Sequence, residues 1–151
     1  MIEIHSTFMR HSGGTKFYEV VSILNADTDN AVVIKRWGKL SAFRTGGGQC
    51  DCKSFVSRQQ MSDFVSKAIC DKNSRGYTID AGDFGIHIRR SSEIEAESLE
   101  GVLEDHYADE AVVKYAIQTC SWGVSVSPTT TVSVSVSVGP GPERGPDWAS
   151  W

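Results

Sequence analysis

One short stretch of the sequence gathers residue types that stack on flat rings and hold anions. A β-branched run at 32–34 is typical of a strand, and it leads directly into Lys35, Arg36, Trp37 and Lys39. A flat indole ring among cations could stack on another ring while the neighbouring charges hold an anion. A core tryptophan beside solvated lysines would give the same pattern, so both interpretations stay open at this point.

Four cysteines offer a second kind of chemistry, either metal ligation or disulfide formation. Cys50 and Cys52 do not have the spacing of a zinc knuckle, and no matching pair follows them, so we expect no metal site. In a strand these two thiols point to opposite faces and cannot pair with each other. Disulfide pairing with Cys70, with Cys120 or with another chain stays open.

The histidines do not form a catalytic pattern. His106 begins the sequence His-Tyr-Ala-Asp-Glu, which is not the zinc-protease motif H-E-x-x-H. His5, His11 and His87 have no nucleophile or ligand partner at a recognisable spacing. We therefore expect a non-enzymatic protein that uses no cofactor.

Charge is distributed unevenly along the 151 residues, whose net charge is −4. Residues 1–80 hold 11 Lys/Arg against 8 Asp/Glu, whereas residues 81–120 hold 3 against 9. The first part could meet phosphates, but the overall acidity weakens long-range attraction to nucleic acid. No apolar run has the length of a membrane span, and the start lacks signal-peptide features. We therefore expect cytoplasmic synthesis and no association with a membrane.

A β-hairpin is predicted to position the four residues Lys35, Arg36, Trp37 and Lys39. Residues 16–24 are aromatic and β-branched and predict a strand, and the polar residues 25–30 predict the turn that follows it. Residues 40–43 are then expected to pair with the strand that contains Trp37. The triple glycine at 46–48 lacks the Gly-Lys-Ser/Thr of a phosphate loop, and we interpret it as a flexible hairpin tip.

An amphipathic helix is predicted after the glycines. Apolar residues recur at helical spacing over 54–71, and Gly76 is a suitable residue to end the helix. Short strands are expected at 2–5, 77–79 and 84–88.

The order of these segments resembles the WGR domain, a small module named for its Trp-Gly-Arg motif. The likeness lies in Lys-Phe-Tyr-Glu-Val at 16–20, Arg-Trp-Gly-Lys at 36–39, the glycine loop, the helix and Arg-Gly-Tyr at 75–77. It covers residues 16–79. The family is best known from DNA-dependent poly(ADP-ribose) polymerases and also occurs as a stand-alone module in bacteria and phages.

The resemblance implies an antiparallel sheet with one packed helix and a nucleic-acid contact at the motif. Trp37 would stack on a base or pack on a sugar, and Lys39 and Arg36 would reach phosphates. Lys39 stands where arginine is usual in the family, and a lysine cannot make the bidentate contact of a guanidinium. The residues outside the likeness are too few for an ADP-ribosyl transferase domain.

Three parts of the chain follow from these patterns. Residues 1–90 form a WGR-like α+β domain, residues 91–120 an acidic helical segment, and residues 121–151 an extended tail with a Gly/Pro/Trp end. Ser92 and Glu95 have capping-box spacing and predict the start of the acidic helix. One face of that helix is apolar and comprises Leu99, Val102, Leu103 and His106. Its carboxylates are interpreted as a solvated face.

The tail alternates valine and serine with almost no charge. Four valines share one face of this predicted strand, namely Val132, Val134, Val136 and Val138. An isolated ribbon of this kind buries too little apolar surface to be stable in water. We therefore expect it to join a sheet edge, a neighbouring subunit's rather than its own, with Trp148 and Trp151 as aromatic anchors. A disordered low-complexity tail is the alternative.

Two functions are compatible with the sequence. The overall acidity and the tail favour a structural protein, an accessory or cement-type component of a phage-like particle or virion. It would dock to protein neighbours in multiple copies, with the cysteines available for cross-links. The alternative is a nucleic-acid-binding WGR module that contacts DNA through Trp37, Lys39, Arg36 and Lys35. Salt-dependent DNA binding that is lost in Trp37→Ala favours the alternative, whereas association lost without residues 121–151 favours the structural role.

Overall fold

The fold is built around an antiparallel β-sheet. The computed structural model describes residues 1–80, 88, 91–120 and 131–134, and these contain seven strands in one sheet. The strand order is β5-β1-β2-β3-β4-β7, with β6 also paired to β1. The strands are β1 (Ile2–His11), β2 (Lys16–Asn25), β3 (Ala31–Lys39), β4 (Gln49–Phe55), β5 (Tyr77–Ile79), β6 (Ser91–Ile94) and β7 (Thr131–Val134). The helices are α1 (Leu40–Phe43), α2 (Arg58–Asn73), the 3-10 helix η1 (Ala96–Ser98), α3 (Leu99–His106) and α4 (Glu110–Cys120).

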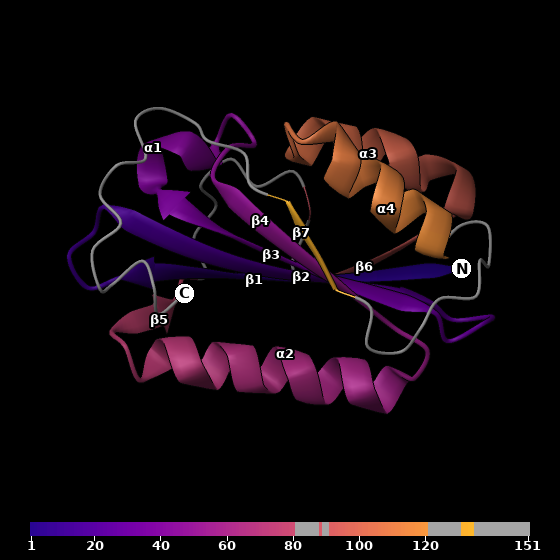
Figure 1. Cartoon of the computed structure of the whole chain (residues 1–151), viewed down its shortest axis with the longest axis horizontal. Helices are drawn as coiled ribbons and strands as arrows, with labels where there is room; N and C mark the ends of the chain where they lie inside the picture. The colour runs from indigo at the N-terminus through magenta and orange to yellow at the C-terminus, as the bar shows by residue number, and fades with distance from the viewer. Residues whose placement is uncertain (81–87, 89–90, 121–130, 135–151) are drawn as a thin grey trace.

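Helices cover both faces of the sheet (Figure 1). Helix α2 packs on one face through a core that includes Val33 and Met61. Helices α3 and α4 pack on the other face through a core that includes Ile34 and Leu103. The predicted α+β class and antiparallel sheet are confirmed, and the acidic segment forms a second covering layer. No helix in the described parts of the chain is both long and apolar enough to cross a membrane.

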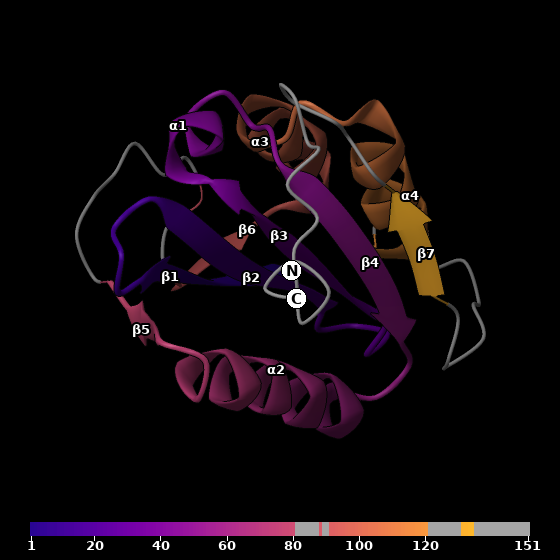
Figure 2. The same ribbon diagram turned by 60° about the vertical axis from the view of Figure 1, so that its left-hand side comes forward.

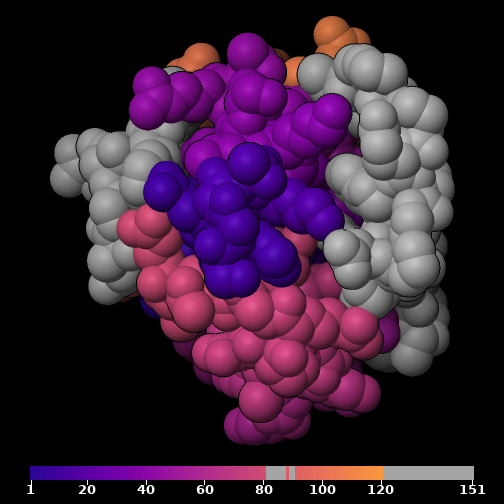
Figure 3. Space-filling view, turned by 90° about the vertical axis from the view of Figure 1, so that its left-hand side faces the viewer, coloured from indigo at the N-terminus to yellow at the C-terminus, as the bar shows by residue number. Residues whose placement is uncertain are grey.

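The predicted hairpin is present, but the segment that follows it is not a strand. Strands β2 and β3 pair so that Tyr18 lies opposite Trp37. Residues 40–43 form α1, because the buried Phe43 packs against Phe8 and Phe17 at centroid distances of 4.7 and 4.9 Å. Figure 3 shows this end of the sheet (indigo), with α1 above it and the α2–β5 segment below.

The α2 helix starts later than the sequence suggested. We expected it to begin at residue 54, but Phe55 is buried at the end of β4 and α2 begins at Arg58. Ser57 is the N-cap, and its hydroxyl accepts a hydrogen bond from the Gln60 N–H at 3.3 Å. The apolar stripe was therefore interpreted correctly, and its first residue belongs to the preceding strand.

The acidic segment also begins differently from the prediction. Residues 91–94 form β6 against β1, so Ser92 does not cap a helix, and α3 begins only at Leu99. The apolar face of α3 is confirmed, since Leu99, Leu103 and His106 are buried. The strand predicted at 84–88 lies outside the described residues, apart from Ile88, which is buried in the core under α3 and α4.

The described part of the tail pairs with the same chain. Strand β7 lies antiparallel to β4, with Val132 opposite Cys52 and Val134 opposite Cys50 (Figure 2). The expectation of a neighbouring subunit's edge is therefore wrong for residues 131–134, because they cover the outer edge of β4, whose backbone groups would otherwise lack a strand partner. The remaining tail residues that we predicted to bind partners lie outside the described residues: Val136, Val138, Trp148 and Trp151.

Candidate nucleic-acid interface

Trp37 lies half-buried on the face of β3 that α2 partly covers. Its indole Nε1 donates a hydrogen bond to Gln49 Oε1 of β4 at 3.0 Å. The indole also stacks with Tyr18 of β2, at a centroid distance of 6.4 Å and an interplanar angle of 28°. These contacts hold the ring in one orientation while part of it remains exposed.

Two glycines let the glycine loop pack directly on the end of β3. A Cβ on Gly48, whose φ is +104°, would lie 2.6 Å from the Trp37 carbonyl oxygen. A Cβ on Gly38 would lie 3.3 Å from the Cα of Gly48. The loop therefore supports the backbone behind Trp37, and the exposed Lys39 follows at the end of the strand.

A basic cavity opens beside Trp37, between α2 and the strands β3 and β4. Its volume is about 300 Å³, and five cations line it: Lys35, Lys53, Lys67, Lys72 and Arg75. Among the described residues, Asp71 is the one carboxylate in the lining, and Tyr18 and Phe64 form apolar walls. Because Tyr18 also stacks on Trp37, the indole and the cavity are neighbours on one face of the sheet.

The phenyl ring of Phe64 holds two of these cations. The Nζ atoms of Lys35 and Lys53 lie 5.1 and 4.9 Å from the ring centroid. Lys35 also lies 3.6 Å from Asp51 in a partly exposed ion pair. The two cation–π contacts orient the ammonium groups and leave their positive charge in place, whereas Asp51 offsets part of the charge of Lys35.

Lys72 is the most enclosed of the five cations. Its side chain is buried, and Nζ lies 5.1 and 5.9 Å from the ring centroids of Tyr18 and Tyr77. Burial, together with the nearby charges of Arg75 and Lys35, lowers the pKa of Lys72 to about 8. A phosphate in the cavity would favour the charged form and raise this pKa again.

Arg36 does not belong to this surface. The sequence interpretation placed its guanidinium on phosphate, but the side chain is completely buried on the opposite face of the sheet. It lies 3.2 Å from Glu19 and donates hydrogen bonds to the carbonyl oxygens of Phe43 and Gly47 at 3.2 and 3.3 Å. The alternation of a strand explains the correction, because residues 35 and 37 share one face and residue 36 points to the other.

Comparison with family models matches the WGR domain to residues 5–84, a range that contains β2 to β5 and α2. The chain belongs to the WGR domain family. WGR domains are nucleic-acid-binding modules. The match begins earlier than the resemblance at 16–79, because most of β1 is part of the domain. Comparison with curated proteins and with solved structures gave no match.

Within the WGR domain, the structure brings together Trp37 and Lys35 and places Lys39 at the strand end. Sequence reasoning missed the other four cations of the cavity, which are Lys53, Lys67, Lys72 and Arg75. One signal was present, since Phe64, Ala68 and Lys72 recur every four residues along the helix and therefore share a face. Nothing in the sequence indicated that this face meets Lys35 and Lys53.

Buried polar contacts of Glu19 and Arg36 with His106 connect α3 to the WGR domain. Glu19 Oε2 lies 2.6 Å from His106 Nε2, and the side chains of Glu19, Arg36 and His106 are buried. Burial alone would raise the pKa of Glu19, but the charges and hydrogen bonds of Arg36 and His106 outweigh it and lower that pKa. The carboxylate is therefore ionised inside the core.

The cysteines do not form disulfides in this structure. All four thiols are free, so neither Cys50 nor Cys52 pairs with Cys70 or Cys120 within the chain. Cys50 and Cys52 of β4 and Cys120 at the end of α4 are buried in the core between the sheet and α3 and α4, whereas Cys70 is exposed on α2. Burial raises the pKa of Cys50 and of Cys120 to about 12. The described residues contain no group of three or more His, Cys, Asp or Glu placed to hold a metal ion.

Proposed function

We propose that this protein binds nucleic acid through the α2-side face of its WGR domain and catalyses no reaction. The observation that carries the proposal is the juxtaposition of the basic cavity with a partly exposed indole on one face of the sheet. Proteins that bind nucleic acids hold the phosphates with cations and stack bases or sugars on aromatic rings. The five cations and Trp37 supply both kinds of contact.

The cations are spread widely enough to follow a backbone rather than to hold a single phosphate. Lys67 and Lys72 are five residues apart on α2, which corresponds to roughly 7.5 Å along the helix, and Arg75 lies in the turn that follows the helix. Lys35 and Lys53 approach the same cavity from the sheet, and Lys39 continues the positive surface past Trp37. In this arrangement the lysines and arginine position the backbone, while Trp37 contacts a base or sugar.

A building-block role in a phage-like particle has lost its main support. That role depended on a tail that joins a neighbouring subunit, whereas residues 131–134 pair with β4 of their own chain. No feature of the described residues favours it over nucleic-acid binding.

Binding of a labelled DNA duplex, followed by fluorescence anisotropy, tests the proposal. Between about 50 and 200 mM salt the wild-type protein should lose affinity steeply, because bound cations release counterions from the DNA. The double variant Lys67→Gln/Arg75→Gln should reduce the log–log salt slope by about 2. Trp37→Ala should weaken binding with little change in slope, since it removes no charge.

Lys114→Gln is the matched control, because it removes an exposed cation from α4 on the opposite side of the sheet. It should leave both affinity and slope unchanged. Circular dichroism and the melting temperature establish that each variant is folded. Equal losses in the control and the double variant, or no binding at low salt, would refute the proposal.

A further inference from the structure

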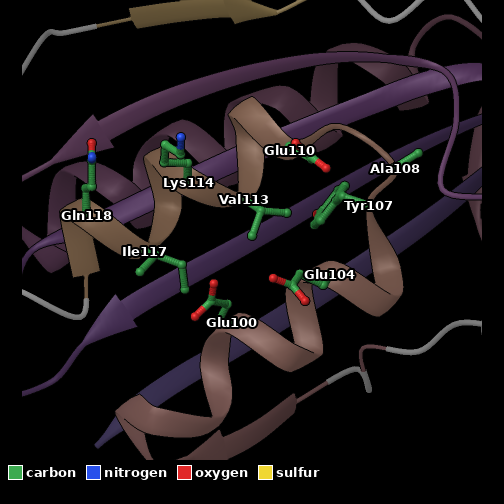
Figure 4. A pocket seen from close by; sticks show the side chains of 9 residues that line it. All are labelled: Glu100, Glu104, Tyr107, Ala108, Glu110, Val113, Lys114, Ile117 and Gln118. Atoms are coloured by element: carbon green, nitrogen blue, oxygen red, sulfur yellow. The ribbon is translucent and has the colours of Figure 1, made fainter.

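A larger groove lies on the other face of the molecule, between α3 and α4 (Figure 4). Its volume is about 780 Å³. Sites for small molecules typically have volumes of roughly 300–1,000 Å³. We name this feature the α3–α4 groove; its rim carries Glu100, Glu104 and Glu110, and its inner surface includes Tyr107, Val113 and Ile117.

The lining of the α3–α4 groove suits a ligand that is both cationic and aliphatic. The described part of the lining holds three carboxylates and one ammonium, that of Lys114, so the rim is acidic. Val113 is buried and Ile117 is half-buried, and both belong to the core that α3 and α4 share with the sheet. Charged ends of a ligand would meet the rim while its methylene groups cover these apolar side chains.

An independent observation at the floor of the groove points to a missing polar partner. The ring of Tyr107 extends from the α3–α4 turn toward the space between Val113 and Glu104 (Figure 4). The residue is 3% exposed, and its hydroxyl has no hydrogen-bond partner among the described residues. Burial, and next to it the charge of Glu19, keep the pKa of Tyr107 well above its ordinary value. The hydroxyl therefore stays protonated, and its oxygen can accept a hydrogen bond.

We propose that the α3–α4 groove binds a linear aliphatic polyamine whose ammonium groups are separated by three or four methylenes. Glu100 and Glu104 lie four residues apart on α3, which places their Cβ atoms roughly 5–6 Å from each other. Ammonium groups joined by four methylenes have a similar separation, so each can pair with one carboxylate. The methylenes between them lie over Val113 and Ile117, and a further ammonium reaches Tyr107.

The same chemistry could come from a lysine side chain of a partner protein. The two carboxylates at helical spacing favour the free polyamine, because a lysine brings a single ammonium to the groove. A divalent metal ion would use the carboxylates but would gain nothing from the apolar floor. The groove lies across the sheet from the basic cavity, so this inference is independent of nucleic-acid binding.

Calorimetric titration of the full chain with spermidine at near-physiological salt tests the inference. Spermidine should bind at least tenfold more tightly than butylamine, which has a single ammonium. The double variant Glu100→Gln/Glu104→Gln should weaken spermidine binding about tenfold, as the sum of two partly exposed ion pairs. Tyr107→Phe should weaken it about fivefold to tenfold without lowering the melting temperature, because the lost hydroxyl has no protein partner.

The matched control is Glu97→Gln/Asp105→Asn, which removes the same charge from exposed positions on η1 and α3 that do not line the groove. It should leave spermidine binding unchanged. Equal weakening by the control would show only nonspecific attraction to an acidic surface and would overturn the inference. Binding of Nα-acetyl-lysine amide or of Mg²⁺ as tightly as spermidine would also overturn it.

Discussion

Removal of the negative charge of Glu19 is expected to destabilise the fold strongly. The Glu19 carboxylate lies 3.2 Å from Arg36 Nε and 2.6 Å from His106 Nε2, and it is completely buried. In Glu19→Gln the guanidinium of Arg36 stays in the interior without a counter-charge. Breaking a buried ion pair in this way costs about 3–5 kcal/mol. That is a large part of the roughly 5–15 kcal/mol by which a domain of this kind is stable.

Urea unfolding followed by tryptophan fluorescence at neutral pH measures the effect. The matched control is Glu3→Gln, which removes a carboxylate that pairs with Arg58 at 2.8 Å on the surface. The control should cost far less, because water already competes for both partners of an exposed pair. If the two variants lose the same free energy of unfolding, the buried charges do not stabilise α3 against the sheet, and the reasoning fails.

A pH series gives a second test of the same group. The pKa of Glu19 is lowered in the folded protein, whereas in the unfolded chain it is about 4.3. The stability that this shift contributes is therefore present above about pH 4.3 and is lost as the pH falls through the folded-state value. The difference in unfolding free energy between wild type and Glu19→Gln should shrink over that acidic range. A difference that stays constant would contradict the assigned direction.

Three further predictions concern single side chains. DNA affinity should fall as the pH rises through about 8, because Lys72 loses its charge there. The variant Lys72→Met should show a weaker pH dependence. Fluorescence anisotropy at pH 7 and 9 measures the difference. Gly101→Ala should raise the unfolding free energy by about 0.5–1 kcal/mol, since a helical Cβ there meets no neighbouring atom within 4 Å. Cys70 should react quickly with a thiol reagent in the native protein while Cys50 and Cys120 react only on unfolding.

The sequence was sufficient to predict the elements that depend on local pattern. The β-branched run and the polar turn gave the β2–β3 hairpin, and the apolar stripe gave α2. A signal for the second helical layer was also present. Residues 31–34 are apolar without alternation, which is typical of a strand buried on both faces, and α3 has an apolar face that needs a surface to cover it.

The site itself could be predicted only in part. Strand alternation places Lys35 and Trp37 together and sends Arg36 to the other face, and this argument was available from the sequence. The arrival of Lys67 and Arg75 beside them was not predictable, because it depends on where α2 crosses the sheet. Likewise, His106 occupied an apolar helix position, and only the packed structure reveals that its partner is a glutamate from β2.

The layered fold also explains how a chain with a net charge of −4 can present a basic surface. The cations of the cavity lie on the α2 side of the sheet, and the carboxylates of the α3–α4 groove lie on the other side. The layers between them keep the two groups roughly 10 Å or more apart. At physiological salt the screening length is about 8 Å, so the acidic layer barely weakens a phosphate contact in the cavity. At about 0.01 M salt that length reaches roughly 30 Å, and Glu100→Gln/Glu104→Gln should then strengthen DNA binding.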